Sequence, residues 1–306
     1  MRKHKDFYVI GIDHGYGNIK TANCCFPTGI MKNDIEPTFA GDLLVWNGKH
    51  YSIGIGHKEF TADKFMDEDY YVLTLAAIAR ELRREHITEA SVFIAAGLPL
   101  TWVSEQKAAF KAYLLQNERV SFSFRGVEYH IRFVGAEIFP QGFAAIADRL
   151  HEFKGVNMLC DIGNGTMNIL RIVNKKPDVR NMFTEKYGTH QCSLLIREQL
   201  MKRHHTTLDE AVITEILKKG SADIDAQYLD TVIETAKEYT AGIFRKLREH
   251  EYDPKLMKLY VVGGGGCLIH NFADHDKSRV IINDDICATA KGYEYMTLMS
   301  LKRGND

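Results

Sequence analysis

The sequence contains no run of about 18 apolar residues, the length that a membrane-spanning helix needs. Its first residues pass from a charged tip straight into an apolar segment, without the apolar core and cleavage site of a signal peptide. Neither sign of charge is in excess, because 39 Lys and Arg stand against 40 Asp and Glu. These absences predict a cytoplasmic protein with no membrane partner, and they exclude a strong basic surface for direct nucleic-acid binding.

Cysteine spacing and turn-residue content exclude further classes. The six cysteines include no Cys-x-x-Cys pair, the spacing of many zinc and redox sites. We interpret them as reduced, mostly buried thiols. Glycine and proline supply only 24 and 6 of the 306 residues, which excludes a collagen-like or low-complexity chain. The length instead predicts about two globular domains.

The apolar segments alternate between strand and helix patterns. Short apolar runs bounded by turn residues predict buried strands at 7–12, 91–96, 156–160 and 256–262. Between them, apolar residues recur with helical spacing at 75–82 and 229–247. Two hairpins are predicted, with turns at Asn47-Gly48 and Arg125-Gly126. This alternation is typical of an α/β fold.

One short motif occurs twice. Residues 13–19, DHGYGNI, are echoed by residues 161–169, DIGNGTMNI, each after an apolar strand. The two copies are separated by about half of the chain. The repeat predicts two similar domains that face one another, each presenting a strand-turn-strand hairpin that begins with an aspartate.

The residue types in these hairpins suit phosphate and metal binding. Glycine has no Cβ, so backbone N–H groups can approach phosphate oxygens closely. A carboxylate at the end of a buried strand is costly unless a cation or donors meet it. We therefore expect Asp13 and Asp161 to hold Mg²⁺ through its water shell, between two hairpins that grip a nucleotide. For either hairpin alone, a tight turn without a ligand is the alternative. The expected phosphate-binding residues are Gly15, Tyr16, Gly17, Asn18 and Lys20 in the first hairpin, and Gly163, Asn164, Gly165 and Thr166 in the second.

Four consecutive glycines, Gly263, Gly264, Gly265 and Gly266, follow a predicted strand and precede an apolar helical stretch. Backbone exposed there is expected to contact the α-phosphate and ribose of a nucleotide. Neither a Walker A sequence nor the dinucleotide fingerprint occurs in the chain. A nucleotide site here would therefore be neither a P-loop nor a Rossmann site.

Five motifs, in order, resemble those of the actin superfamily. IGIDHGYGNIK, MLCDIGNGTMNIL and LYVVGGGG look like its phosphate-1, phosphate-2 and adenosine motifs, and residues 135–143 and 288–292 look like its two connecting motifs. Within the superfamily the sequence is most similar to the ParM/StbA family of plasmid-segregating bacterial actins. That similarity lies in Asn-Ile-Lys after the first hairpin, residues 97–100, and Glu-x-x-Pro-x-Gly at 137–142.

The resemblance implies an actin-like fold of two lobes, with duplicated ribonuclease-H-like domains and a nucleotide cleft between them. Domain I would hold residues 1–153 and 288–306, and domain II residues 154–287. The implied activity is Mg²⁺-dependent hydrolysis of ATP to ADP, or of GTP to GDP. The protein would polymerise with itself into filaments, which a DNA-binding adaptor protein links to plasmid DNA.

The resemblance also implies roles for single residues. Glu137 would position or deprotonate the water that attacks the γ-phosphate, and Lys218 would line the base pocket. From the residues alone, Glu137 has the alternative of a carboxylate that stabilises the N-terminus of a helix starting near Pro140. Lys218 has the alternative of a simple helix C-terminus at Gly220. The charged residues Arg80, Glu81, Arg83, Arg84 and Glu85 are expected on an exposed helix face or in a protomer contact.

Two rival functions remain open from the sequence. A small-molecule kinase of the same superfamily would need an added substrate pocket, and two lobes that fill 306 residues leave little sequence for one. A nucleotide-binding scaffold that neither hydrolyses nor polymerises would use the same motifs.

Overall fold

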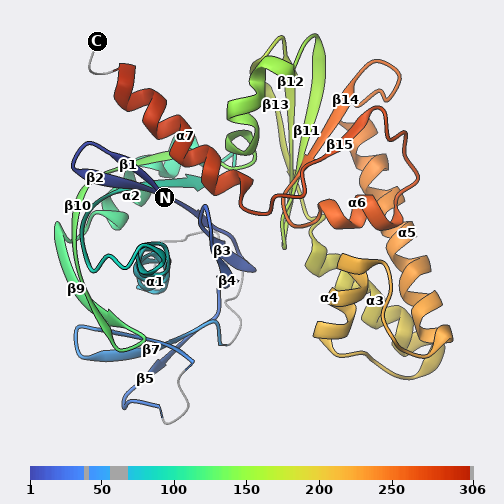
Figure 1. Ribbon diagram of the computed structural model, residues 1–306. Coiled ribbons are helices and arrows are strands. Elements are labelled where there is room, and N and C mark those ends of the chain that lie inside the picture. The colour runs from blue at the N-terminus through green and yellow to red at the C-terminus, as the bar shows by residue number, and fades with distance from the viewer. Residues whose placement is uncertain (38–40, 56–67, 304–306) are drawn as a thin grey trace. The chain divides into compact units, whose positions relative to one another are not determined.

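The computed structural model describes residues 1–37, 41–55 and 68–303 (Figure 1). The chain divides into two units, which we call unit 1 and unit 2. Unit 1 comprises residues 1–148 and 287–306, and unit 2 comprises residues 149–286. The division predicted from the sequence falls at 153/154 and 287/288, near these two crossings.

Unit 1 contains most of the strands. They are β1 (Arg2–His4), β2 (Phe7–His14), β3 (Asn18–Lys20), β4 (Cys25–Pro27), β5 (Ile30–Asn33), β6 (Asp42–Trp46), β7 (Lys49–Ile53), β8 (Glu89–Leu98), β9 (Arg119–Phe124) and β10 (Val127–Pro140). Its helices are α1 (Asp69–Arg84), α2 (Val103–Leu114) and α7 (Ala288–Arg303), and the 3₁₀ helix η1 (Phe143–Glu152) leads into unit 2. Within the described residues the strands form one sheet in the order β4-β3-β2-β8-β10-β9-β6-β7-β5, with β1 added to β2.

Unit 2 is built around a smaller sheet in the order β13-β12-β11-β14-β15. The strands are β11 (Val156–Ile162), β12 (Met167–Val173), β13 (Lys176–Glu185), β14 (Lys258–Val262) and β15 (Val280–Ile282). The helices are α3 (Thr189–His204), α4 (Glu210–Lys219), α5 (Ala226–Glu249) and α6 (Gly266–Phe272). Met158, Cys160 and Ile162 of β11 pack with buried side chains of α3 and α5.

The two sheets share one topology. In unit 1, β2 pairs antiparallel with β3 and parallel with β8, and β8 pairs parallel with β10. In unit 2, β11 pairs antiparallel with β12 and parallel with β14, and β14 pairs parallel with β15. The strand order and directions of β4-β3-β2-β8-β10 therefore repeat in β13-β12-β11-β14-β15. This confirms the duplicated α/β domains predicted from the repeated motif.

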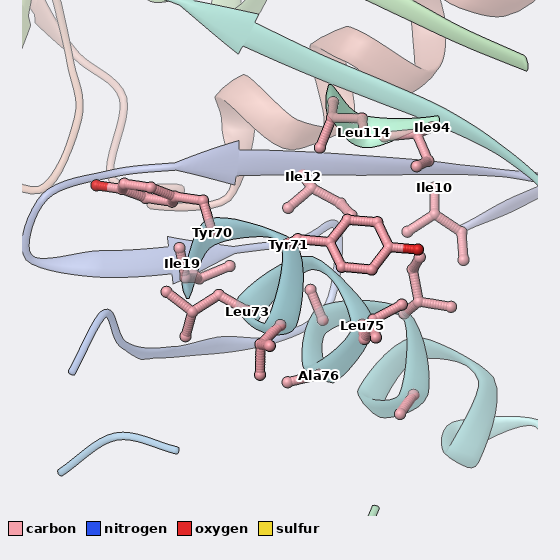
Figure 2. Close-up of a cluster of buried hydrophobic side chains, with 14 of the residues drawn as sticks. Ile10, Ile12, Ile19, Tyr70, Tyr71, Leu73, Leu75, Ala76, Ile94 and Leu114 are labelled. Atoms are coloured by element: carbon pink, nitrogen blue, oxygen red, sulfur yellow. The ribbon is translucent and has the colours of Figure 1, made fainter. Parts of the chain in front are cut away.

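Helices cover both faces of the unit 1 sheet. Successive residues of a strand point to opposite faces, and Ile10 and Ile12 of β2 belong to the core formed with α1 and α2. Val9, which precedes Ile10 and points to the opposite face, packs instead with Tyr293 of α7. Figure 2 shows α1 beneath β2 and β3. Ile12 of β2 and Ile19 of β3 are buried in the same cluster as the side chains of α1. The first of the two repeated hairpins, residues 13–19, thus begins on a strand that packs against a helix.

The predicted strands, helices and tight turns are present with small shifts at their ends. Leu75, Ile78, Ala79 and Leu82 are all buried on α1. Both central residues of the two predicted turns have positive φ, at Asn47-Gly48 and at Arg125-Gly126. This is the backbone that a two-residue type I′ hairpin requires. None of the six cysteines forms a disulfide, and two of them, Cys160 and Cys192, are buried rather than most of them as predicted.

Two local predictions are wrong. No α-helix starts near Pro140, because β10 continues to that residue in parallel pairing with β8 and the 3₁₀ helix η1 begins only at Phe143. The charged cluster on α1 is not an exposed face throughout. Glu81 is 1% exposed, and Arg80 pairs with Asp42 while stacking over Phe26. In the part of the chain that the structure describes, no helix is long and apolar enough to cross a membrane.

Candidate functional site

Asp13 ends the central strand of unit 1 and is held by two neighbours. It pairs in register with Lys20 on β3, whose Nζ lies 3.8 Å from Asp13 Oδ2. The side-chain amide of Gln141 donates to Asp13 Oδ1 at 3.0 Å. Asp13 itself is only 7% exposed. A nearly buried carboxylate that meets a cation and an amide donor satisfies the condition that burial of its charge imposes.

The turn after Asp13 is held by hydrogen bonds within it and from a neighbouring residue. Gly15 N–H donates to the Asp13 carbonyl at 3.0 Å, and a Cβ on Gly15 would lie 2.6 Å from the Asn18 carbonyl oxygen. Thr28, directly after β4, supports the turn, with its hydroxyl donating to Gly15 O and its N–H to Gly17 O. Tyr16 is half-buried in this turn, and burial raises the pKa of its phenol, which keeps it protonated.

Glu137 lies inside β10, not at a helix start. It pairs in register with Ala95 of β8, which pairs with Gly11 of β2. Its carboxylate is 29% exposed and contacts two lysines of α2, Lys107 at 2.5 Å and Lys111 at 3.9 Å. The helix N-terminus alternative for Glu137 therefore loses its basis.

Gln141 is a site residue that the sequence analysis quoted within a motif without giving it a role. It follows β10, its N–H donates to Leu98 O at 2.9 Å, and its amide reaches Asp13. The strand pairing of β10 with β8 brings it there from 128 positions away. Its only signal in the sequence is a polar amide at the end of a strand, next to a glycine.

The two connecting segments meet in unit 1. A Cβ on Gly292 of α7 would lie 1.8 Å from the Ala144 carbonyl oxygen of η1, and one on Gly11 of β2 would lie 2.0 Å from the Ala290 carbonyl oxygen. Only glycine permits backbones to approach this closely. Gly11 N–H also donates to the Glu294 carboxylate at 3.1 Å. The strand that carries Asp13 is thereby packed directly on α7.

The second hairpin repeats the first in unit 2. Asp161 on β11 pairs in register with Asn168 on β12, as Asp13 pairs with Lys20. Asn168 is buried, and its Oδ1 accepts a hydrogen bond from the Thr184 hydroxyl at 2.9 Å. Gly163 N–H donates to Thr166 O at 2.8 Å and closes the turn. Asn164 faces the start of α3, where its carbonyl accepts from His190 N–H at 2.9 Å.

The glycine loop lies directly against Asp161. Gly263 has φ +87°, and a Cβ there would lie 2.4 Å from Asp161 Oδ1. Gly265 N–H donates to Ile162 O at 2.9 Å, while no atom lies within 4 Å of a Cβ placed on Gly264. The pairing of β11 with β14 thus joins the second phosphate motif and the four-glycine motif, Gly263 to Gly266, at one edge of the unit 2 sheet.

Lys218 lies close to this edge. It is exposed near the end of α4, and Gly220 ends that helix in the left-handed conformation. The side-chain amide of Asn271 on α6 donates to the carbonyls of Leu217 and Lys218 at 3.1 and 2.9 Å. Burial raises the pKa of Cys267 at the start of α6, and the positive charge of Lys218 opposes that shift. Gly220 therefore ends a helix, as one interpretation of the sequence predicted. The backbone carbonyl of Lys218 is also hydrogen-bonded to α6.

The predicted site residues thus fall into two groups. Unit 1 brings together Asp13, the first hairpin with Lys20, and Gln141, while Glu137 contacts lysines. Unit 2 brings together Asp161, the second hairpin, the glycine loop and Lys218. Within the described residues, no group of three or more His, Cys, Asp or Glu side chains could hold a metal ion.

One family model matches part of the chain. The family model "Actin like proteins N terminal domain" matches residues 11–143, the segment that contains the first hairpin and Glu137. Residues 11–143 are therefore similar to an actin-like N-terminal domain. No curated protein matches the sequence significantly.

Solved structures match almost the whole chain. The archaeal actin homologue Ta0583 is 18% identical, with a TM-score of 0.74 over 95% of this chain and 99% of that chain. It has also been solved in complex with ADP. Bacillus thuringiensis ParM with ATP is 12% identical, with a TM-score of 0.71 over 97% and 99%. Alp12 in its filament is 14% identical, with a TM-score of 0.68 over 97% and 99%. The chain therefore has the actin-like fold, and the resemblance to bacterial actins is confirmed at that level.

Proposed function

We propose that this actin-like protein is a Mg²⁺-dependent ATPase of the ParM/StbA type that polymerises into nucleotide-dependent filaments. The observation that carries the proposal is the duplicated hairpin: Asp13 and Asp161 occupy the same position on the central strands of two sheets with one topology. Two nests of backbone N–H groups, each beside a carboxylate, suit one nucleotide and its cation. Support also comes from similar structures that hold ADP or ATP, and from one solved as a filament.

The residues present fit Mg²⁺. This ion is commonly bound by one or two carboxylates, with phosphate oxygens and water completing its octahedron. Asp13 and Asp161 would supply the carboxylates, and the ion would neutralise charge on the phosphates. The glycines of the two hairpins, with Tyr16, Asn18, Lys20, Asn164 and Thr166, would bind the phosphates. Gly263 to Gly266 and Lys218 would hold the nucleoside. ATP or GTP would fit these contacts.

Glu137 would act on the attacking water. General-base help is worth about 10²- to 10⁴-fold in rate. In this proposal Lys107 and Lys111 hold the carboxylate in place, and Gln141 orients Asp13. The filament would move plasmid DNA through a DNA-binding adaptor protein, which agrees with the near-neutral charge of the chain.

Phosphate release by the purified full-length protein tests the enzyme. We expect Mg²⁺-dependent release from ATP, and a loss of at least about tenfold in each of Asp13→Asn and Asp161→Asn. Because both carboxylates would serve one ion, the double variant should be less than additively worse. Asp230→Asn, an exposed carboxylate of α5, is the matched control and should release phosphate at the wild-type rate.

The outcomes separate the rivals. ADP formed only in the presence of a sugar or another small acceptor would identify a kinase. Nucleotide binding without phosphate release or assembly would identify a scaffold. Fully additive losses from the two aspartates would contradict a shared ion.

A further inference from the structure

Unit 2 contains a pocket that none of the five motifs explains. It has a volume of about 870 Å³ and lies between α5 and the segment 271–280, which joins α6 to β15. None of its lining residues belongs to the second hairpin or to the glycine loop. Pockets of about 300 to 1,000 Å³ are typical of small-ligand sites. The concave shape thus suits a small molecule.

The lining of this pocket is rich in positive charge. Four side chains are Lys or Arg, namely Lys237, Arg245, Arg248 and Arg279, against two Asp. The first three recur along α5 with spacings that place them on one face of the helix. Within the described residues none of these three forms an ion pair, whereas Lys246 on the same helix pairs with Glu249 at 2.6 Å. Cations left without partners around a pocket attract an anion.

One of the two acids, Asp276, forms hydrogen bonds within its own loop. Asp276 Oδ1 accepts hydrogen bonds from Ser278 N–H at 2.8 Å and from the Ser278 hydroxyl at 2.7 Å. These bonds lower the pKa of Asp276 and hold its charge on the loop. Asp276 stays negatively charged and interacts with Arg279. The four cations thus face two acids, and the lining keeps an excess of positive charge.

Tyr252 supplies an independent observation. It lines the pocket, is 4% exposed, and its hydroxyl is buried with no hydrogen-bond partner among the described residues. A buried polar group without a hydrogen-bond partner destabilises the folded protein. Burial raises the pKa of this phenol, so it remains a donor at neutral pH. An acceptor atom of a ligand would remove the cost.

The remaining lining is apolar. Phe244, Phe272 and Val280 line the pocket beside the cations, and Phe272 and Val280 are buried. Inorganic phosphate alone would leave these surfaces uncovered. A ligand that covers both kinds of surface needs a charged group and an apolar body.

We propose that this pocket binds a small organic anion, with its phosphate or carboxylate group on the α5 cations, Arg279 and the Tyr252 hydroxyl, and its apolar body on Phe244 and Phe272. The site lies at the opposite end of α6 from the glycine loop. It stands independently of the proposed ATPase activity.

The test is titration calorimetry on the full-length protein, with excess ADP present so that a nucleotide site elsewhere is filled. The probes are 2-naphthyl phosphate, 2-naphthoate, uncharged 2-naphthol and inorganic phosphate. We expect one of the two aromatic anions to bind at least about tenfold more tightly than naphthol or inorganic phosphate. The difference between the two anions tells whether the site prefers phosphate or carboxylate.

Variants connect the binding to this pocket. Reversing Lys237, Arg245 and Arg248 to Glu should weaken the preferred anion by at least about tenfold, since the cations lie at the proposed contact. Tyr252→Phe removes only the hydroxyl and should weaken binding about three- to tenfold without lowering the thermal midpoint. The matched control reverses three exposed lysines elsewhere in unit 2, Lys176, Lys186 and Lys202, and should bind like the wild type.

Three results would overturn the proposal. They are the absence of binding by either aromatic anion, equal binding of 2-naphthol, and equal loss in the control triple variant. Binding of an oligoglutamate peptide together with failure of both aromatic anions would instead assign the surface to an acidic protein partner.

Discussion

Three carboxylates of unit 1 differ chiefly in their hydrogen-bond and ion-pair partners. Asp13 meets an amide and an ammonium group, and Glu137 meets two lysines on the partly exposed side of α2. Glu81 is 1% exposed and accepts hydrogen bonds from Thr21 and Asn23, about 60 positions away in the sequence. We therefore propose that the first two carboxylates are available for chemistry, whereas the third is structural.

For Glu137, substitution by alanine should slow phosphate release by at least about tenfold while nucleotide affinity stays within a few-fold. A residue that acts only in the transition state lowers kcat without weakening ground-state binding. Steady-state phosphate release and nucleotide titration measure the two effects. Glu105→Ala, an exposed carboxylate of α2, should leave both unchanged. Equal losses in Glu137→Ala and Lys107→Ala would make the ion pair, rather than the carboxylate, the important feature.

For Glu81, the amide variant Glu81→Gln should lower the free energy of unfolding at pH 7 by about 1.5 to 3 kcal/mol. Both carboxylate oxygens accept hydrogen bonds, with Asn23 donating its N–H to one and its side-chain amide to the other at 2.9 Å. An amide in place of the carboxylate would put a donor against one of these donors. Urea unfolding measures the difference in the free energy of unfolding. Glu85→Gln, at the exposed residue that follows α1, should change that free energy by less than about 0.5 kcal/mol.

The same variant has a defined pH dependence. Burial alone raises the pKa of Glu81, but the hydrogen bonds from Thr21 and Asn23 outweigh it and leave the pKa below its ordinary value. The stabilisation is therefore present above that ordinary value, and it is lost as the pH falls through the lower folded-state pKa. The difference in the free energy of unfolding between wild type and Glu81→Gln should therefore become smaller in acid. A gap that widens in acid would show that the carboxylate is not stabilised as described.

At the scale of elements, close backbone approaches decide where the motifs lie. The backbones of β2 and η1 both contact α7 closely at glycines, and the loop after β14 contacts β11 closely. Strand pairing sets these contacts, since β11 and β14 run parallel with Asp161 opposite Val262. The second aspartate and the glycine loop are therefore parts of one local structure in unit 2.

Gly263→Ala tests that structure. Its Cβ would lie 2.4 Å from Asp161 Oδ1, so the carboxylate or the loop must move. We expect nucleotide affinity, measured by titration, to fall by at least about tenfold, together with a loss of stability. Gly155→Ala is the control, because Gly155 also has positive φ but no atom within 4 Å of a Cβ. It should show the stability cost of the backbone strain alone, with affinity unchanged. Similar losses of affinity in both variants would contradict the contact with Asp161.

At the scale of the whole molecule, the prediction concerns assembly. If the γ-phosphate supplies contacts that the diphosphate lacks, it favours one arrangement of the protein by that differential affinity. A head-to-tail contact between successive copies is heterologous, and it yields an open filament unless the rotation closes a ring. A change of about 1.4 kcal/mol in that contact would change the critical concentration about tenfold.

Pelleting and light scattering across protein concentrations measure this effect. We expect a lower critical concentration with ATP or AMPPNP than with ADP, each with Mg²⁺. Assembly that ignores the nucleotide would contradict the coupling. No assembly at any concentration with AMPPNP and Mg²⁺ would leave the kinase or the scaffold.

Local and repetitive features of this protein could be predicted from its sequence. The turns at Asn47-Gly48 and Arg125-Gly126 follow from residues that accept positive φ, and the core face of α1 follows from helical spacing. The repeated Asp-x-Gly-x-Gly pattern indicated two related domains, because a duplicated motif at half-length requires two similar supports. Each of those signals is carried by a short stretch of neighbouring residues.

Long-range pairing decided the rest. Glu81 is part of a charged run that is typical of a solvated helix face. It is nevertheless buried, and its carboxylate accepts hydrogen bonds from Thr21 and Asn23. Pro140 suggests a break, yet pairing with β8 carries β10 to that residue and places Gln141 on Asp13. The sequence by itself determined the elements, the duplication and the aspartates, because these depend on neighbouring residues. Only the tertiary structure decided which donor meets each carboxylate, because those partners come from strands and helices far apart in the chain.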